Sequence, residues 1–359
     1  MRAAVLFEPR ARLSIEEVSL EDPGPGELKV KLAATGVCHT DVHRQEASLG
    51  GPLPVVLGHE GAGIVEAVGA GVRSVAPGDH VVLYVIPSCG VCEFCLQGQP
   101  YWCTEHTRSL PNGTLITGAR RLSQDGRPLN HFFGQSSFAE YAVVAERTAV
   151  KVRPDAPLDV VCLLACGAST GIGAVLNALS GHLGARVAIF GCGGVGQSAI
   201  LGARLLHASA IIAVDVLEGK LAMARDLGAT GTVNAAQSDP VQAIRDLTGG
   251  GVDYSFELIG SPDATAQALA AVRTGGKTVL VGGPGGVIIP AGVTRGKTLT
   301  WTTGGNIVAG TQIPRLIDLY MAGVLPLDRL ITRTYALDGI NDAFAAMKAG
   351  EVARSVIRF

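Results

Sequence analysis

The sequence predicts an α/β protein with two domains, one rich in antiparallel strands and one built on a doubly wound parallel sheet. The first of three observations behind this is length, since 359 residues with 47% hydrophobic side chains can form two cores. The second is a series of short strand patterns, separated by Pro–Gly turns, in the residues up to about 150. The third is an alternation of apolar strands and helical patterns that begins after about Cys166.

The predicted strands of the N-terminal part are short, and they either alternate in polarity or are rich in β-branched residues. They cover residues 28–33, 61–68 and 80–86. Turn sequences rich in Pro and Gly precede or separate them at 23–26 and 76–79. Short strands joined by tight turns are typical of an antiparallel, barrel-like β region.

The later part of the chain predicts a parallel sheet. Short apolar segments have the composition of buried strands at residues 186–190, 210–215, 254–258 and 278–281. Helical periodicity is found at residues 197–207, 219–227, 313–321 and 340–349, and a last strand pattern covers residues 355–359. Strands that alternate with helices indicate a parallel sheet, because each parallel connection needs a crossover segment.

Composition excludes several classes of function. Lys and Arg number 29 against 31 Asp and Glu, so the chain has a net charge of −2 and no basic footprint for nucleic acid. No apolar run approaches the roughly 20 residues that span a membrane. The first residues lack the pattern of a secretory leader, and eight cysteines without an export signal favour metal ligands or free thiols over disulfides. We therefore expect a cytoplasmic enzyme with no membrane partner.

A glycine-rich turn predicts a dinucleotide site. Gly191, Gly193 and Gly196 form G-x-G-x-x-G between the predicted strand 186–190 and a helix. The first glycine permits the tight turn, the second allows a pyrophosphate to approach the backbone, and the third lets helix and strand pack closely. The helix N-terminus then supplies N–H donors for the phosphates.

The end of the next predicted strand favours NAD over NADP. Asp215 stands where a carboxylate binds the adenosine ribose hydroxyls. The same carboxylate would repel a 2′-phosphate, and the residue after it is Val216 rather than an arginine.

Four cysteines lie close together in a loop-like segment, and they predict a structural zinc site. Thiolates at tetrahedral spacing close such a site and leave no position for substrate. An iron–sulfur cluster and a redox pair are the alternatives, but nothing else in the sequence indicates electron transfer. The residues are Cys89, Cys92, Cys95 and Cys103.

Three further metal-binding residue types are scattered along the chain. Cys38 follows a predicted strand, His59 precedes one, and Cys166 stands at the junction of the two parts. Taken singly, each is also compatible with a buried thiol or a core histidine. Cys162 and Cys192 are interpreted as small apolar core residues.

Taken together, these motifs resemble the zinc-dependent alcohol dehydrogenases of the medium-chain dehydrogenase/reductase superfamily, in particular the liver-type branch. The resemblance covers nearly the whole chain, through GVCHTDVH, GHEGAGIVEAVG, the four-cysteine segment, FFGQSSFAEYAVV, CGASTGIGAVLNA, GCGGVG and GEVARSVIRF. It implies a GroES-like, β-rich catalytic domain at 1–167 and 303–359, with a Rossmann NAD-binding domain at 168–302.

The resemblance also implies two zinc ions per chain and assigns the ligands of the catalytic one. Cys38, His59 and Cys166 would be its ligands, as in the Cys₂His site known for alcohol dehydrogenase. Glu60 would be a carboxylate near the metal, and Asp41 would orient His59 through the ring N–H.

The reaction implied is reversible hydride transfer between a primary alcohol and NAD⁺, which gives an aldehyde and NADH. Thr40 would contact the substrate oxygen, and His43 would be the outer end of the proton relay. The implied cofactor contacts are His39, Thr170, Gly191, Gly193, Gly194, Val195, Gly196, Asp215, Lys220 and Arg354, of which His39 and Arg354 would lie near the pyrophosphate.

The substrate pocket is expected to be wide. In register with the liver-type enzymes, Val85 occupies a position that often holds a large aromatic residue, and Phe132 and Phe133 line the same cleft. This favours longer-chain or aromatic alcohols.

Thiol-adduct (formaldehyde) dehydrogenases are the alternative within the family. They need acidic and arginine groups at the pocket mouth, where this chain has Leu49, Gly51 and Thr107. Arg108 is adjacent, so a different thiol carrier stays open.

An alternative of another class is a non-catalytic scaffold that keeps the fold. The presence of every expected metal ligand and of Thr40 argues against it. The resemblance further implies a homodimer, with a tetramer as the alternative, formed by β-pairing of the segment 297–301 across a two-fold axis.

Overall fold

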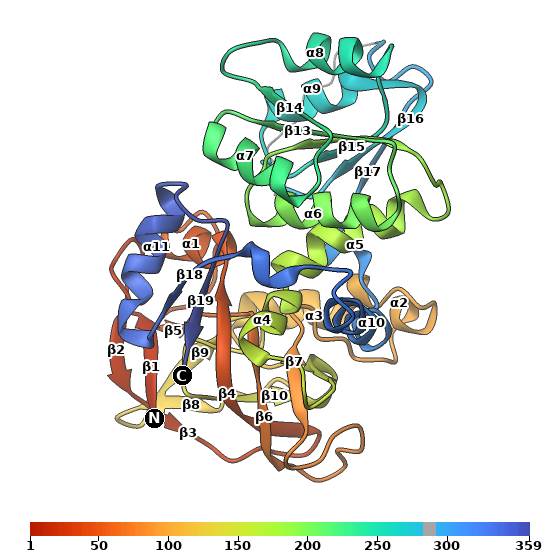
Figure 1. The fold of residues 1–359 in the computed structure, drawn as a ribbon. Helices are drawn as coiled ribbons and strands as arrows, with labels where there is room; N and C mark the ends of the chain where they lie inside the picture. The colour runs from red at the N-terminus through yellow and green to blue at the C-terminus, as the bar shows by residue number, and fades with distance from the viewer. Residues whose placement is uncertain (283–291) are drawn as a thin grey trace. The chain divides into compact units, whose positions relative to one another are not determined.

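The computed structural model describes residues 1–282 and 292–359 and divides the chain into two compact units (Figure 1). The first unit contains Met1–Cys166 and Val308–Phe359, and the second contains Gly167–Ile307. The second boundary is later than the residue 302 that the family resemblance implies. The reason is local, because the Asn177 amide donates hydrogen bonds of 2.8 and 2.9 Å to the carbonyls of Gly305 and Asn306.

Two sheets, mostly antiparallel, form the frame of the first unit. One has the order β2–β1–β5–β9–β8–β3, and the other has the order β11–β7–β6–β4–β19–β18 with β10 beside β4. The strands of the first sheet are β1 Arg2–Leu6, β2 Ser14–Glu17, β3 Ser19–Leu20, β5 Val55–Val56, β8 Leu122–Gln124 and β9 Arg127–His131. Those of the second are β4 Glu27–Val37, β6 Gly61–Val68, β7 His80–Leu83, β10 Tyr141–Ala145, β11 Ala149–Lys151, β18 Ile331–Tyr335 and β19 Arg354–Arg358.

Strand β4 is the centre of the second sheet, and it ends at the candidate metal site. It pairs in antiparallel fashion with β6, β10 and β19. Its first residues alternate between buried and more exposed positions, whereas its last four are all buried. A strand buried on both faces in this way carries the chain into the interior at Val37, directly before Cys38.

Short helices complete the first unit: α1 His39–Gln45, α2 Glu93–Leu96, α3 Thr104–Ser109, α4 Leu158–Val161, α10 Ala309–Met321 and α11 Ile340–Lys348. Helix α11 shows why the C-terminal segment returns to this unit. It buries Ile340, Ala343, Phe344 and Met347, which recur at the spacing of one helix face. They join a hydrophobic core that also contains Phe138.

In the described residues of the second unit, six strands form a sheet in which all paired strands are parallel, in the order β14–β13–β12–β15–β16–β17. Helices lie on both faces of the sheet (Figure 1). Its strands are β12 Arg186–Phe190, β13 Ala210–Asp215, β14 Gly231–Asn234, β15 Val252–Glu257, β16 Val272–Leu280 and β17 Thr298–Trp301. Its helices are α5 Gly167–Leu179, α6 Gly194–Leu205, α7 Glu218–Leu227, α8 Pro240–Thr248 and α9 Pro262–Ala271.

This architecture confirms the predicted fold class, a GroES-like β-rich unit with a Rossmann-type parallel sheet. The predicted helix at 197–207 begins earlier, at Gly194, because Gly194 and Gly196 already belong to the first turn of α6. The predicted strand at 80–86 ends at Leu83, where the chain leaves the sheet.

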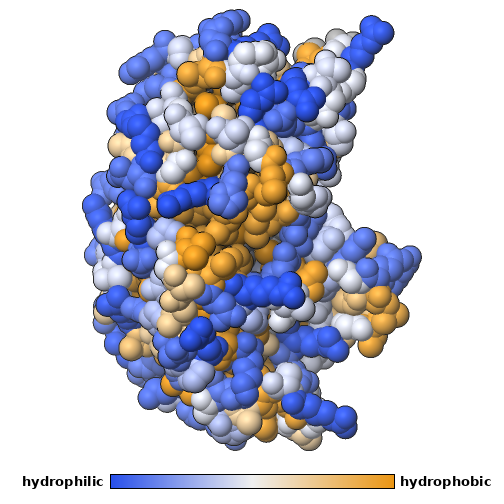
Figure 2. Space-filling view, turned by 45° about the vertical axis from the view of Figure 1, so that its right-hand side comes forward, coloured by the Kyte–Doolittle hydropathy of each residue, from blue (hydrophilic) through white to orange (hydrophobic). Residues whose placement is uncertain are grey.

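Hydrophobic side chains reach the surface in the segment that carries the four cysteines. Val91 is 74% exposed, Leu96 is 75% exposed and Trp102 is 40% exposed. Figure 2 shows hydrophobic side chains gathered on a lobe at the right, the side on which α2 lies in Figure 1.

Within the described residues, no single helix is both long enough and apolar enough to cross a membrane. One bent pair, Leu158–Ala165 with Gly167–Leu179, meets the criteria of length and composition only.

Candidate functional site

The first candidate site begins where β4 passes into α1. Cys38 has an extended backbone conformation and precedes the first residue of the helix. Its backbone N–H donates to Asp41 Oδ2 at 3.1 Å. Asp41 therefore caps the N-terminus of α1 and fixes the turn from which the Cys38 thiol projects.

Asp41 also holds His59. Its Oδ1 lies 3.0 Å from His59 Nδ1 and accepts the backbone N–H of Gly58 at 3.0 Å. Both side chains are fully buried. A carboxylate at Nδ1 keeps a proton on that nitrogen, so in the neutral ring, the form that binds metals, the lone pair is on Nε2. Nε2 is buried and has no hydrogen-bond partner among the described residues.

The orphaned Nε2 belongs to a cluster of metal-binding groups. One ligand atom from each of Cys38, His59, Glu60 and Cys166 lies within 4.8 Å of the others. Two sulfurs, one imidazole nitrogen and a carboxylate form a donor set that fits zinc. Folding thus brings together the three scattered residues that the sequence singled out, and the family resemblance assigns a catalytic zinc to them.

The two thiols of this cluster are electrostatically different. Hydrogen bonding to Cys166 lowers the pKa of Cys38 well below its ordinary value, with a further contribution from His59. The same contact raises the pKa of Cys166. One of the two sulfurs is therefore readily available as a thiolate, the form that binds metals.

Glu60 forms a buried ion pair with Arg354 on β19. Burial raises the pKa of Glu60 to about 6, although the Arg354 charge opposes the shift. Gly36 on β4 makes room for the pair, because a Cβ there would lie 1.9 Å from Glu60 Oε2. The resemblance expects Arg354 near a pyrophosphate, and the structure places its side chain, 3% exposed, against Glu60.

The predicted relay residues lie on α1. Thr40 is half-buried, and its Oγ1 is 3.6 Å from Cys38 Sγ. His43 is exposed one turn later, with Nδ1 3.1 Å from Ser48 Oγ. His39, the expected pyrophosphate contact, is exposed at the start of the same helix.

Aromatic residues cover His59. The Phe132 and Phe133 ring centroids lie 5.6 and 5.1 Å from the His59 ring centroid. Phe133 has a positive φ of 50°, which is unusual for a bulky side chain and could not be foreseen from the sequence. Val85 is also buried, and its N–H donates to the Ala165 carbonyl at 2.9 Å, one residue before Cys166. The three predicted pocket residues therefore lie around the cluster or beside its ligands.

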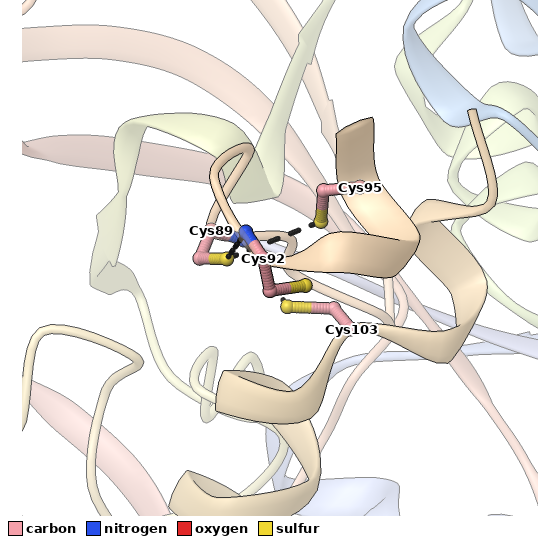
Figure 3. A group of neighbouring side chains, drawn as sticks. All are labelled: Cys89, Cys92, Cys95 and Cys103. Atoms are coloured by element: carbon pink, nitrogen blue, oxygen red, sulfur yellow. Dashed lines mark hydrogen bonds between the residues drawn. The ribbon is translucent and has the colours of Figure 1, made fainter. Parts of the chain in front are cut away.

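The second cluster contains the four neighbouring cysteines, whose sulfurs lie within 4.8 Å of one another (Figure 3). Backbone N–H groups point at these sulfurs, with Cys89 donating to Cys103 Sγ at 3.2 Å and Cys92 donating to Cys89 Sγ at 3.3 Å. Backbone hydrogen bonds lower the pKa of Cys92 to about 6, whereas burial raises that of Cys95 to about 12. All four cysteines are free, and their sulfurs are close enough together for one metal ion to contact all of them.

The predicted dinucleotide turn lies in the second unit, between β12 and α6. Gly191 has a φ of 94°, and a Cβ on Gly196 would lie 1.9 Å from the Gly191 carbonyl oxygen. A Cβ on Gly193 would meet no atom within 4 Å. Gly191 thus permits the tight turn, Gly196 permits the close packing of helix on strand, and Gly193 leaves open backbone that a phosphate can approach. Gly194 and Val195 form the first turn of α6.

Asp215, at the end of β13, is held by backbone N–H groups. Its Oδ2 accepts from Cys192 at 2.8 Å, and its Oδ1 accepts from Val216 and Leu217 at 2.8 and 3.0 Å. The side chain is thus fixed beside the glycine turn, at the end of the strand where the sequence predicts a ribose contact.

Gln197 is a positioning residue that the sequence analysis missed. It is fully buried, and its amide donates to the carbonyls of Cys192 and Lys220 at 3.0 and 2.9 Å. It therefore ties the glycine turn to α7, which carries Lys220. Thr170, the expected nicotinamide contact, is half-buried on α5.

Comparison with known proteins agrees with this architecture. The family model of the alcohol dehydrogenase GroES-like domain matches residues 24–154, and that of the zinc-binding dehydrogenases matches residues 194–320. An alcohol dehydrogenase zinc-binding domain protein from Burkholderia ambifaria is 40% identical with a TM-score of 0.96, over 100% of this chain and 98% of that one.

Two further structures bear on function. The benzyl alcohol dehydrogenase of Acinetobacter calcoaceticus is 38% identical with a TM-score of 0.95, over 100% of this chain and 99% of that one. A structure from Sinorhizobium meliloti, assigned as a zinc-binding dehydrogenase and bound to NADP, is 27% identical with a TM-score of 0.81, again over 100% and 99%. Full-length similarity of this degree extends the family assignment to both units. The chain therefore belongs to the zinc-dependent alcohol dehydrogenases of the medium-chain dehydrogenase/reductase superfamily.

Proposed function

We propose that the protein is a zinc-dependent, NAD-linked dehydrogenase that interconverts primary alcohols, preferably aromatic or long-chain ones, with their aldehydes. The observation that carries the proposal is His59 Nε2, which is buried, unpartnered in the described structure, and grouped with the sulfurs of Cys38 and Cys166. A buried nitrogen without a partner is costly unless a ligand satisfies it.

The metal, when bound by Cys38, His59 and Cys166, would polarise the substrate oxygen and lower its pKa. The chain's own residues supply the remaining functions. Thr40, two residues after Cys38, offers a hydroxyl beside the ligand sulfur for the substrate proton. His43 is exposed on the same helix and can pass that proton to water. Glu60 and Arg354 add a buried charge pair beside the metal ligands.

A second, structural zinc is proposed for Cys89, Cys92, Cys95 and Cys103. Four sulfurs within 4.8 Å would close the coordination sphere and leave no open position for chemistry. The cluster lies in a segment of short helices and turns, where a metal would stabilise the local fold.

NAD is proposed as the cofactor rather than NADP. The Asp215 carboxylate stands at the end of β13 and would repel a 2′-phosphate. Val216, which follows it, is 57% exposed and offers no positive charge. The NADP-bound relative is more distant than the benzyl alcohol dehydrogenase, at 27% against 38% identity.

Aromatic or long-chain alcohols are proposed as substrates for two reasons. The position of Val85, beside the backbone of Ala165, holds a small side chain where a larger ring would narrow the site. The relative from Acinetobacter calcoaceticus, at 38% identity, is a benzyl alcohol dehydrogenase. A thiol-adduct substrate is less well supported, since Leu49, Gly51 and Thr107 provide no charge at the expected positions.

The test is kcat/KM for benzyl alcohol and for ethanol, with NAD and with NADP, on protein whose zinc content has been measured. We expect two zinc ions per chain, a strong preference for benzyl alcohol and a strong preference for NAD. Equal or ethanol-favouring values would contradict the wide pocket. No activity in fully zinc-loaded protein would favour the thiol-adduct or the scaffold alternative.

We also propose a homodimer that forms through β17. This strand is at the edge of the described parallel sheet, and its Trp301 is 51% exposed. An exposed strand edge is a ready site for pairing with a second copy. Light scattering on purified protein would distinguish dimer, tetramer and monomer.

A further inference from the structure

The first unit contains a cavity of about 330 Å³ whose two basic lining residues, Arg44 and His131, have no role in the site described above. Its volume is at the lower end of ligand pockets, enough for one ring or a short chain. Most of its wall is apolar or glycine, and none of its lining residues is acidic. The lining residues are Arg44, Leu49, Gly50, Gly51, Pro52, Val55, Leu110, Pro111, His131 and Phe132.

Arg44 brings a buried positive charge to this cavity. Its side chain is 3% exposed, and Nη2 donates to the carbonyls of Gly51 and Pro52 at 2.7 and 2.8 Å. In the described part of the chain, no carboxylate pairs with it. A guanidinium carries five N–H donors in a planar fork, and two backbone carbonyls on one nitrogen do not use them all. A buried cation without a counter-ion is costly, which indicates a site that an anion completes.

His131 adds a second donor to the same wall. Its Nε2 accepts the backbone N–H of Arg121 at 3.1 Å, so the proton of the neutral ring is on Nδ1. Burial lowers the pKa of His131 to about 4, which keeps the ring neutral near pH 7. Nδ1 is buried and has no partner among residues 1–282 and 292–359. The lining thus contains two residues with unused N–H donors and no acidic residue, which favours a ligand that accepts hydrogen bonds.

Phe132 belongs both to the wall of this cavity and to the surroundings of His59. It lines the cavity, and its ring is in edge contact with the His59 ring at a centroid distance of 5.6 Å. Leu49, Val55 and Leu110 add apolar side chains to the lining. A ligand that fits this wall has an apolar body and one charged or strongly accepting head.

We propose that this cavity binds a carboxylate at the far end of the substrate, with Arg44 as the specificity-determining residue and His131 as a second donor. The substrates would then be alcohols or aldehydes that also carry a carboxylate. This inference rests on the proposed dehydrogenase function and narrows its substrate class. A carboxylate is favoured over a neutral acceptor because the remaining N–H donors of a buried guanidinium form charge-assisted hydrogen bonds with it, which are stronger than neutral ones.

The test compares ω-hydroxyalkanoates with the matching ω-hydroxyalkanamides over a series of chain lengths. The two differ in charge but hardly in shape. For the natural sequence we expect kcat/KM to be at least about tenfold higher for the carboxylates at one optimal length. The difference should appear mainly in KM, because the head group is bound equally before and during hydride transfer.

Two variants change the charge of the cavity in different ways. Arg44→Gln removes the charge, and Leu110→Glu places a carboxylate in the cavity wall. Each should lower the carboxylate-to-amide ratio by about tenfold or more. Arg127→Gln on β9 is the matched control, since Arg127 is exposed and its loss changes the net charge equally. The ratio should not change in this control. An unchanged ratio in both cavity variants, or no carboxylate preference at any length, would overturn the proposal.

A binding measurement separates this inference from the proposed function. Hexanoate is titrated calorimetrically into the zinc-loaded protein and into Arg44→Gln. Binding that is at least about tenfold weaker in the variant supports the carboxylate site, even if no alcohol is oxidised and the dehydrogenase proposal fails. Equal binding of hexanoate by the two proteins, or no binding by either, overturns the carboxylate site. Normal activity on neutral alcohols would in that case leave the dehydrogenase proposal intact.

Discussion

At the scale of single residues, Asp41 is the organising group of the metal site. Its two oxygens accept from the backbone of Cys38 and of Gly58 and hold His59 Nδ1. One carboxylate therefore sets the positions of two proposed ligands and the tautomer of one of them. An amide of the same shape cannot do this, because one of its two ends is a donor that would face another donor.

Asp41→Asn is therefore expected to weaken zinc binding by about 10- to 100-fold. The measurement is competition with a coloured chelator, with the bound metal counted by mass spectrometry. Asp226→Asn, on the exposed side of α7, is the control and should retain zinc normally. Unchanged affinity in Asp41→Asn would show that the position of His59 does not depend on this carboxylate.

Thr40→Ala tests the proton relay. The hydroxyl beside Cys38 is not a metal ligand in the proposed site, so zinc content should stay the same while kcat falls by about a hundredfold or more. Thr40→Ser retains the hydroxyl and should recover most of the activity. Normal turnover by the alanine variant would rule out the relay.

At the scale of elements, close contact between β4, β6 and β19 determines the shape of the site. Gly36 on β4 faces the Glu60–Arg354 pair, and a Cβ would lie 1.9 Å from Glu60 Oε2 and 3.0 Å from Arg354 Nη2. The pair is buried, so it cannot move into solvent when it is displaced. Strand β4 thus has a glycine at the position where the side chains of Glu60 and Arg354 pack against its backbone.

Gly36→Ala should therefore destabilise the protein by about 3 kcal/mol, through overpacking and disruption of a buried ion pair. The matched control is Gly219→Ala on α7, where a Cβ meets no atom within 4 Å. That change should be neutral or stabilise by about 0.5 to 1 kcal/mol. Urea unfolding measures both, and equal midpoints for the two variants would contradict the role assigned to Gly36.

At the scale of the whole molecule, buried histidines make stability depend on pH. The pKa of His131 is lowered from its ordinary 6.5 to about 4 by burial, with Arg120 and Arg121 adding to the shift and Glu27 opposing it. Above pH 6.5 the ring is neutral in both the folded and the unfolded states. As the pH falls from 6.5 to 4, the unfolded state takes up a proton that the folded state does not, so stability is lost.

His131 alone should thus cost about 2 kcal/mol of stability at pH 5 relative to pH 8, and about 3 kcal/mol below pH 4. His131→Gln retains an acceptor for the Arg121 N–H and does not titrate, so its stability should fall less between pH 8 and pH 5. His207→Asn, on an exposed residue of the second unit, is the control. The free energy of unfolding is measured with urea at each pH. An equally steep fall in His131→Gln between pH 8 and pH 5 would contradict this assignment.

The sequence by itself predicted the elements whose signal is local. The glycine turn after β12, Asp215 at the end of β13 and the four neighbouring cysteines are short-range patterns, because in each case the groups that would bind one ligand lie close together along the chain. The β-rich first part and the parallel second part followed from the change in periodicity near Cys166. Element ends shifted by a few residues where packing decided them, as at Leu83 and Gly194.

Family resemblance, rather than spacing, linked Cys38, His59 and Cys166, since such separations carry no geometric information. Only the tertiary structure brought their ligand atoms within 4.8 Å of one another. It also revealed the contact of Arg354 with Glu60, the positive φ of Phe133 and the role of Gln197. The contacts of Arg354 with Glu60 and of Gln197 with Lys220 join separate segments, for which no local pattern in the sequence exists.

The chemistry available to this protein was thus determined by its sequence, through residue types at local spacing and through motifs shared with a family. The proposed selectivity depends on the tertiary structure, because residues of α1, β9 and the segments near residues 50 and 110 together line the cavity. Arg44 resembles any helical arginine in the sequence. Burial against Gly51 and Pro52, without an acidic partner in the described chain, is what makes it a candidate anion site.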